Sequence, residues 1–229
     1  MQHNSNALIV VAKRPAPGKT KTRLSPPLTP ELASALYESF LFDTLDQMRQ
    51  VADSHHVIAY LDECEYFQRL APDFDLIPQE GRDLGERLDN ALTFYLSRGY
   101  ERVVIMDSDS PTLPASYLSQ AFNVLSDGAD VVLGPCDDGG YYLIGFKRPA
   151  PRLLREVHMS TPTVAAETIA LAKDEGLNLI SLPSWYDVDD AASLSRLRQE
   201  IASLHSSVAV YTRQFLQQDV IQALLDGRG

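Results

Sequence analysis

The sequence predicts an α/β fold, a three-layer α/β/α sandwich with a mostly parallel central sheet. Short apolar, β-branched runs alternate along the chain with segments whose apolar residues recur at helical spacing. This alternation is typical of parallel strands joined by crossover helices. The chain has 229 residues, of which 45% are hydrophobic and 22% charged. These values fit a single domain spanning residues 1–229 and exclude disordered and fibrous proteins.

The first half of the chain predicts two strands and two helices. Residues 7–12 form a continuous apolar run, as expected for a strand buried on both faces. A helix is expected over about residues 29–52, because a Thr-Pro pair supplies its N-cap and first turn and apolar residues then keep helical spacing. A second strand is expected at residues 56–61, and a helix with one apolar face at residues 81–97.

The second half continues the pattern. Residues 102–107 form another buried strand, which ends on a carboxylate. The elements expected next are a helix at 118–125, strands at 130–135 and 140–146 around a Gly-Gly turn, a helix at 162–175, a strand at 177–182 and a helix at 190–204. Residues 208–226 are amphipathic and predict an extra C-terminal helix. That helix would pack back on the domain or onto a second copy of the chain, which makes a homodimer one expected assembly.

Charge and cysteine content exclude several classes of protein. The net charge of −11 argues against a nucleic-acid-binding protein. The polar start lacks a basic region, and the apolar run at 7–12 is too short for a signal peptide or a membrane span. Cys64 and Cys136 match no metal-binding spacing and are expected to be free thiols. We therefore expect a cytoplasmic protein with no nucleic acid partner and no membrane span.

A basic loop follows the first predicted strand. No acidic residue occurs in the first 30 positions, whereas the loop carries five cations, Lys13, Arg14, Lys19, Lys21 and Arg23. Prolines stiffen this loop, and such a cluster of cations suits a phosphate-rich ligand. Gly18 opens a Gly-Lys-Thr segment and is expected to lie with the cations beside phosphate. The segment is no P-loop, because the glycine required five residues earlier is a lysine. A solvated surface loop is the alternative.

Two acidic motifs follow predicted strands and predict a divalent metal site. In the extended segment Asp107-Ser-Asp109, alternating residues point the same way and present both carboxylates together. Carboxylates and ligand phosphates are the oxygen ligands that Mg²⁺ or Mn²⁺ prefers. Asp187 and Asp189 can supply a further ligand. The alternatives are turn formation for Asp109 and helix capping for Asp189.

A glycine-rich segment after the strand at 130–135 is a candidate substrate site. Gly139 and Gly140 allow the backbone to approach a ligand closely. Asp138 can act as a catalytic base or hydrogen-bond an acceptor, and Tyr141 or Tyr142 can stack on that acceptor or bond to it. The alternative is a plain hairpin turn, which an Asp-Gly pair favours.

A second glycine pair, Gly81 and Gly85, opens the helix expected at 81–97. A glycine-punctuated helix start can hold a nucleotide base or ribose. Capping through Asp83, with Glu86 three residues later, explains the same pattern.

Five motifs, taken in order, resemble those of a known family. They are K-R-P-x-P-G-x-x-K-T-R-L, Q-x-G-x-D-L-G-E-R, D-S-D-S-P, G-P-x-D-D-G-G-Y-Y-L-I-G and D-V-D-D. This pattern spans about residues 7–200 and resembles the radical-SAM/selenodomain-associated transferases. That family belongs to the nucleotide-diphospho-sugar transferase superfamily with the GT-A fold. The Lys-Thr-Arg-Leu loop is also similar to that of the phospholactate guanylyltransferases.

The resemblance implies roles for individual residues. It implies that Lys13, Lys19 and Arg23 contact phosphate and that Asp107 and Asp109 bind a metal ion. It also implies that Asp187 or Asp189 supplies a second metal contact. The chain departs from the family's pattern at Cys136-Asp137, where an Ala-Glu-like pair is more familiar. The role of Asp137 is therefore left open.

Three functions are consistent with these motifs. The leading hypothesis is a glycosyltransferase that uses a nucleotide-diphospho-sugar donor, a small-molecule acceptor and Mg²⁺ or Mn²⁺. The alternative is a guanylyltransferase-like nucleotidyltransferase, which joins an NTP to a phosphorylated acceptor while Lys19 and Arg23 hold the departing pyrophosphate. The third is a non-catalytic nucleotide-binding module. The basic loop favours nucleotidyl transfer because a triphosphate carries more charge than a sugar diphosphate, whereas the family label favours glycosyl transfer.

Overall fold

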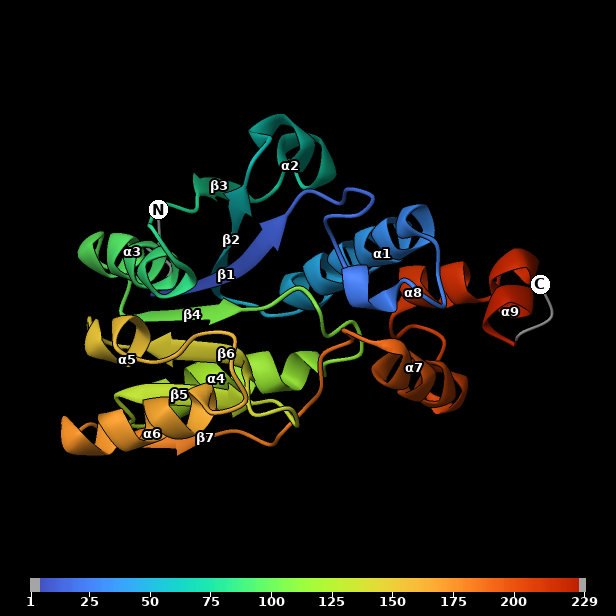
Figure 1. Cartoon of the computed structure of the whole chain (residues 1–229). Helices are drawn as coiled ribbons and strands as arrows, with labels where there is room; N and C mark the ends of the chain where they lie inside the picture. Colours follow the sequence, from blue (N-terminus) through green and yellow to red (C-terminus); the bar gives the residue numbers. More distant parts are fainter. Residues whose placement is uncertain (1–4, 227–229) are drawn as a thin grey trace.

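A seven-stranded sheet lies between two layers of helices in the computed structural model, which describes residues 5–226 (Figure 1). Its strands lie side by side in the order β3 (Asp75–Pro78), β2 (Ser54–Leu61), β1 (Asn6–Lys13), β4 (Arg102–Met106), β6 (Tyr141–Phe146), β5 (Val131–Pro135) and β7 (Leu179–Ser181). Within the described residues β6 alone runs antiparallel to its neighbours. The predicted α/β fold with a mostly parallel sheet is confirmed. The first four residues of the polar start lie outside the described part.

Helices pack against both faces of the sheet. One layer contains α1 (Pro30–Arg49), α2 (Cys64–Leu70), α4 (Ala115–Ser126), α7 (Ala191–Ser203), α8 (Val210–Leu216) and α9 (Asp219–Leu225). The other contains α3 (Leu84–Ser97), α5 (Arg152–Arg155) and α6 (Val164–Asp174). No helix among residues 5–226 combines the length and the apolarity needed to cross a bilayer.

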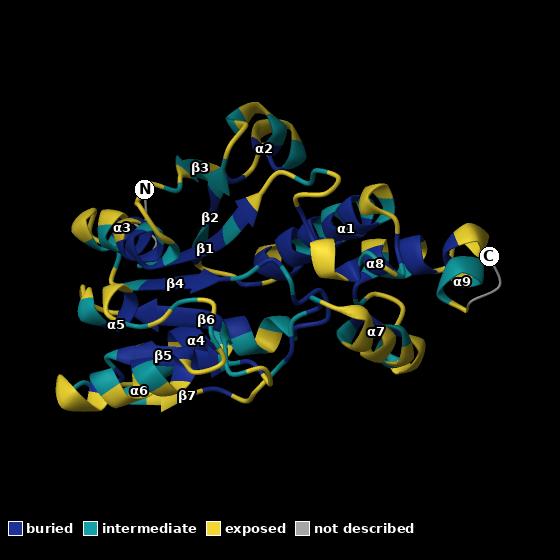
Figure 2. Ribbon diagram, viewed as in Figure 1, coloured by how far each residue is buried: buried dark blue, intermediate teal, exposed yellow. Residues whose placement is uncertain are grey.

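The central strand β1 shows why its sequence is continuously apolar. Leu8 and Val10 pack into the core of the first layer, whereas Ala7 and Ile9 pack into that of the second. Successive side chains of a strand point to opposite faces, so a strand covered on both sides needs apolar residues at every position. Figure 2 shows this strand and its neighbour β4 as mostly buried. The result is a rigid sheet whose carboxyl edge can position polar loops.

Local capping fixes the start of three helices. The Thr29 side chain accepts a hydrogen bond from the Leu32 N–H at 3.3 Å, as predicted. Asp83 caps α3 and Asp190 caps α7 in the same way, each at 2.8 Å. A side-chain oxygen at the N-cap satisfies a backbone donor that the helix itself leaves without a partner.

Four short elements were not expected from the sequence, namely α2, β3, α5 and the 3-10 helix η1 (Thr22–Leu24). They have three to seven residues, too few for a periodic pattern to stand out. The prediction of a single helix at 208–226 is wrong, because the chain forms two helices there, α8 and α9, separated at Gln217 and Gln218. Since α8 packs on α1, this segment folds back on its own chain. The homodimer stays a prediction.

A buried carboxylate holds α8 against α1. Asp43, which is 4% exposed, accepts hydrogen bonds from the backbone N–H groups of Tyr211 at 3.0 Å and Thr212 at 2.8 Å. The Phe42 and Tyr211 rings stack with their centroids 4.9 Å apart. Backbone donors in the first turn of a helix have no partner within the helix, so a carboxylate from outside is well suited to bind them.

Replacing Asp43 with alanine is expected to lower the free energy of unfolding by about 1–3 kcal/mol, because two backbone N–H groups, that of Thr212 fully buried, lose their acceptor. Urea denaturation followed by circular dichroism measures this change. Asp46→Ala on the same helix is the control. Asp46 pairs with Arg49 on the surface, so its loss is expected to change stability by less than about 1 kcal/mol. Equal losses in the two variants would contradict the assigned role.

Candidate active site

The predicted motifs meet at the carboxyl edge of the sheet. The basic loop follows β1, Asp107 and Asp109 follow β4, Asp138 lies between β5 and β6, and Asp187 follows β7 (Figure 1). Ligands of open parallel sheets bind at this edge, because loops from several strands converge there. The arrangement therefore brings residues from four separate segments into one site.

Backbone hydrogen bonds place Asp187 in the site. The Trp185 N–H donates to the Pro135 carbonyl at 3.0 Å, and the Val188 N–H donates to the Asp109 carbonyl at 2.9 Å. These bonds tie the segment after β7 to the end of β5 on one side and to the loop after β4 on the other. Backbone hydrogen bonds of its neighbours in the sequence thus fix the position of Asp187.

The carboxylates of this site repel one another. Burial, helped by Asp109 and Asp187, raises the pKa of Asp107. Burial, Asp189 and Asp138 raise the pKa of Asp187 to about 6. Such shifts arise when several acids share a partly desolvated space with too few cations. The acids are thus suited to a divalent cation, which supplies the missing positive charge.

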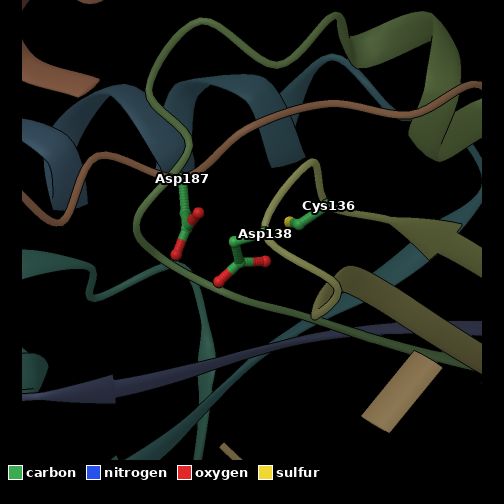
Figure 3. Close-up of side chains that lie close together, drawn as sticks. All are labelled: Cys136, Asp138 and Asp187. Carbon is green, nitrogen blue, oxygen red and sulfur yellow. The ribbon is translucent and has the colours of Figure 1, made fainter. Parts of the chain in front are cut away.

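Three donor groups lie especially close together. The Cys136 Sγ and one carboxylate oxygen each from Asp138 and Asp187 lie within 4.8 Å of one another (Figure 3). Asp138 also accepts a hydrogen bond from the Gly140 N–H at 2.8 Å. Burial, together with the nearby carboxylates, raises the pKa of the Cys136 thiol.

Lys21 has partners that the sequence did not suggest. Its side chain is 5% exposed, and its Nζ lies 2.8 Å from Asp109 Oδ1 and 2.6 Å from Asp189 Oδ1. Burial disfavours the charged ammonium, but the two carboxylates more than offset this and raise the pKa of Lys21. This corrects the expectation that Lys21 presents a free charge to phosphate. Its charge is already shared by two of the predicted metal ligands.

Two adjoining cavities open at this edge. A basic cavity of about 440 Å³ is lined by Lys13, Lys19, Lys21, Arg23, Gln79 and Arg87, among others. An acidic cavity of about 500 Å³ is lined by Asp107, Asp138, Asp187 and the apolar side chains of Leu88, Ile105 and Met159, among others. Arg23, Asp109 and Asp189 line both cavities. A ligand with phosphates in the first cavity would therefore reach the carboxylates of the second.

The five cations of the basic loop do not act alike. Lys13, Lys19 and Arg23 line the basic cavity, and within residues 5–226 none of them forms an ion pair with a carboxylate. Arg14 instead pairs with Glu63 and lines neither cavity. Gly18 is exposed and also lines neither cavity, and the phosphate contacts expected of these two residues stay predictions.

The glycines expected at the site also differ, because some line a cavity and others are required by packing. Gly140 and Tyr141 line the acidic cavity, as expected for substrate-binding residues. Gly139 is required by packing, because a Cβ there would lie 1.9 Å from the Pro162 carbonyl oxygen. Gly85 is likewise buried against the Leu154 carbonyl, which corrects its expected place beside a nucleotide.

Gly81 is exposed and lines neither cavity, and its expected nucleotide contact stays a prediction. Two other members of the same motif, Gln79 and Arg87, line the basic cavity and were missed. The motif ends on a cation, Arg87, and a cation beside the site is a sequence signal for phosphate binding. Ser160 lines both cavities and belongs to no motif, so the sequence offered no sign of it.

Comparison with known proteins identifies relatives of this chain. A family model described as an uncharacterized protein conserved in bacteria, DUF2064, matches residues 44–161. The 2-phospho-L-lactate guanylyltransferase of Methanothermobacter thermautotrophicus is 32% identical over 182 residues, which cover 77% of this chain and 78% of that protein. These matches agree with the resemblance seen in the motifs. The link to radical-SAM proteins stays an expectation.

Solved structures share the fold. A crystal structure of a candidate nucleotide-diphospho-sugar transferase from Desulfovibrio desulfuricans G20 superposes with a TM-score of 0.89 at 31% identity, covering 98% of each chain. A Mycobacterium tuberculosis H37Rv protein solved in complex with manganese superposes with a TM-score of 0.54 at 19% identity, covering 85% of this chain and 97% of that one. The second likeness concerns the fold alone.

Removing the charge of Lys21 is expected to destabilise the protein, because Asp109 and Asp189 then face each other without a cation. The expected loss for Lys21→Met is about 1–3 kcal/mol, less than for a fully buried pair because Asp189 is 42% exposed. Lys19→Met is the matched control, and we expect it to change stability by less than about 0.5 kcal/mol. Urea denaturation without metal compares the two. Similar stability of both variants would show that Lys21 is not an internal counter-charge.

Asp187 is expected to destabilise the metal-free protein as the pH rises. Its folded-state pKa of about 6 lies above the ordinary value, so the folded state is favoured at acid pH and loses stability as the pH rises through about 6. Asp187→Asn cannot ionise, and its melting temperature should therefore exceed that of the wild type by more at pH 8 than at pH 5. Thermal unfolding with a chelator present measures this difference.

Asp189→Asn is the control for this measurement. Although burial acts against its ionised form, Lys21 keeps the pKa of Asp189 below its usual value. Its replacement should therefore lower stability at pH 8, the opposite sign to Asp187→Asn. The same shift in both variants at both pH values would contradict the assignment.

Proposed function

Because the chain belongs to the DUF2064 family and is homologous to a 2-phospho-L-lactate guanylyltransferase, we propose that it is a nucleotidyltransferase. It would transfer the nucleoside monophosphate of an NTP to a small phosphorylated acceptor and release pyrophosphate. The broader statement, a transferase that uses a nucleotide donor, is supported by both this relative and the D. desulfuricans structure.

The basic cavity is the observation that carries this proposal. Lys13, Lys19 and Arg23 line it without an ion-pair partner in the described part of the chain, and Arg87 lines it as well. Such cations are suited to bind a triphosphate, whose charge exceeds that of the diphosphate in a nucleotide sugar. The adjoining carboxylates then lie where the innermost phosphate of the nucleotide would reach the acceptor.

Mg²⁺ or Mn²⁺ is the proposed cofactor, and Asp107 and Asp187 are the residues that would hold it. The raised pKa values of these acids and the manganese in a fold neighbour support this assignment. Asp109 and Asp189 also face this site, but each pairs with Lys21. When bound, such a cation neutralises phosphate charge and stabilises the leaving group.

The residues of the chain would share the work of the reaction. An acceptor oxygen forms a bond to the α-phosphorus while the bond from that phosphorus to the bridging oxygen breaks. Lys19 and Arg23 would bind the departing pyrophosphate, whose charge increases as it leaves. Asp138 lines the acidic cavity with one oxygen fixed by the Gly140 N–H, and its other oxygen would take any proton that the acceptor carries.

Glycosyl transfer from a nucleotide-diphospho-sugar is the second candidate function. The acidic cavity favours it, because Arg23 is the one cation among its lining residues and apolar side chains such as Ile105 and Met159 form much of its wall. An uncharged sugar fits such a surface better than a multiply charged acceptor does. A purely nucleotide-binding module would give no reason for the clustered carboxylates.

Binding to loop variants separates the two reactions. For Lys19→Ala and Arg23→Ala we expect NTP affinity to fall about ten- to a hundredfold each, since one charge-assisted contact contributes about 1.5–3 kcal/mol. Affinity for the matching nucleotide sugar should change much less, because it has no γ-phosphate. Isothermal titration calorimetry with Mn²⁺ present measures both ligands.

Arg14→Ala is the matched control, because Arg14 lies in the same loop but pairs with Glu63. It should leave NTP affinity within about twofold of the wild type. Equal losses for NTP and nucleotide sugar would favour glycosyl transfer. No loss for either ligand would mean that the loop is a solvated surface and would overturn the proposal.

A further inference from the structure

Cys136 adds a sulfur donor to a site whose other donors are carboxylates. It follows the end of β5, is 8% exposed, and within residues 5–226 its thiol makes no hydrogen bond. Figure 3 shows its sulfur on the side facing Asp138 and Asp187. A buried thiol without a partner, directed at two carboxylates, is not explained by the reaction proposed above.

The spacing of these donors suits a single small cation. The Sγ and the two carboxylate oxygens lie within 4.8 Å of one another. Ligands of one tetrahedral Zn²⁺, at bond lengths of about 2.0–2.3 Å, lie about 3.3–3.8 Å apart. Small rotations of the Asp138 side chain, which is exposed, would bring the three donors to that separation.

We propose that Cys136, Asp138 and Asp187 form a site for a thiophilic divalent cation, with Zn²⁺ bound in preference to Mg²⁺. Three protein ligands leave the fourth position of a tetrahedral ion open for water or a ligand phosphate. On binding, the S–H bond breaks, a bond from sulfur to the metal forms, and the proton passes to the solvent.

The preference follows from the chemistry of the donors. Mg²⁺ demands oxygen ligands in near-octahedral geometry, and a sulfur donor cannot serve it. Thiolate ligands select softer ions such as Zn²⁺, while Mn²⁺ prefers carboxylate and water. Asp187 belongs to both donor sets, so Zn²⁺ would exclude the cation that nucleotidyl transfer uses. The exclusion of the catalytic cation rests on the proposed function, whereas the binding of Zn²⁺ does not.

Cadmium titration tests the site directly, because a bond between Cd²⁺ and a thiolate gives an ultraviolet charge-transfer band. The wild type and Cys64→Ser, which removes the other cysteine, should both show the band with one Cd²⁺ per chain. Cys136→Ser should lack it. Zn²⁺ affinity should fall at least tenfold in Cys136→Ser, while Mg²⁺ and Mn²⁺ affinities change less than threefold.

Asp138→Asn is a second variant. We expect it to fold normally because Asp138 is exposed. It should keep the band but bind Zn²⁺ at least fivefold more weakly. A band that persists in Cys136→Ser, or equal losses for Zn²⁺, Mg²⁺ and Mn²⁺ in that variant, would overturn the proposal. These titrations contain no nucleotide. A failure to bind NTP would therefore contradict nucleotidyl transfer and would not change the result expected for Zn²⁺ and Cd²⁺.

Discussion

Repulsion among carboxylates at the carboxyl edge of the sheet is the constraint on which the rest of the site depends. Asp107 and Asp187 have raised pKa values because burial and neighbouring acids disfavour their charge. Folding nevertheless brings them together. Strand β4, which precedes Asp107, is buried in the two cores, and backbone hydrogen bonds tie the segment of Asp187 to the end of β5 and to the loop after β4. The stability gained in the cores offsets the unfavourable electrostatics at the edge, as is common where a site must bind a cation.

The chain balances this charge in two ways. Lys21 is buried between Asp109 and Asp189 and neutralises them from within. Lys13, Lys19 and Arg23 instead lie in the basic cavity and, within residues 5–226, have no ion-pair partner, so their charge is available to a ligand. One loop thus supplies both an internal counter-ion and cations that are open to a ligand, and the difference between them arises from burial.

The two cavities suggest how one scaffold can serve related transferases. The basic cavity and the shared acids suit a nucleotide donor, whichever bond of it is broken. Under the proposed function, the wall of the acidic cavity, with Ile105 and Met159, would decide which acceptor fits. Function in such folds is set by these side chains rather than by the sheet. This is why relatives described as a guanylyltransferase and as a candidate nucleotide-diphospho-sugar transferase can resemble the chain about equally in sequence.

The sequence by itself determined six of the seven strands, the longer helices, two of their caps and the place of the acidic motifs, because these depend on residues within a few positions of one another. Thr29 and Asp83 act on backbone groups three residues away. Only the tertiary structure distinguished Lys21 from Lys19, because one partner of Lys21, Asp189, lies 168 positions along the chain. The same holds for Gly85, whose packing partner Leu154 belongs to another helix. Partners so distant in sequence are brought together by the order of the strands, and nothing in the local pattern encodes that order.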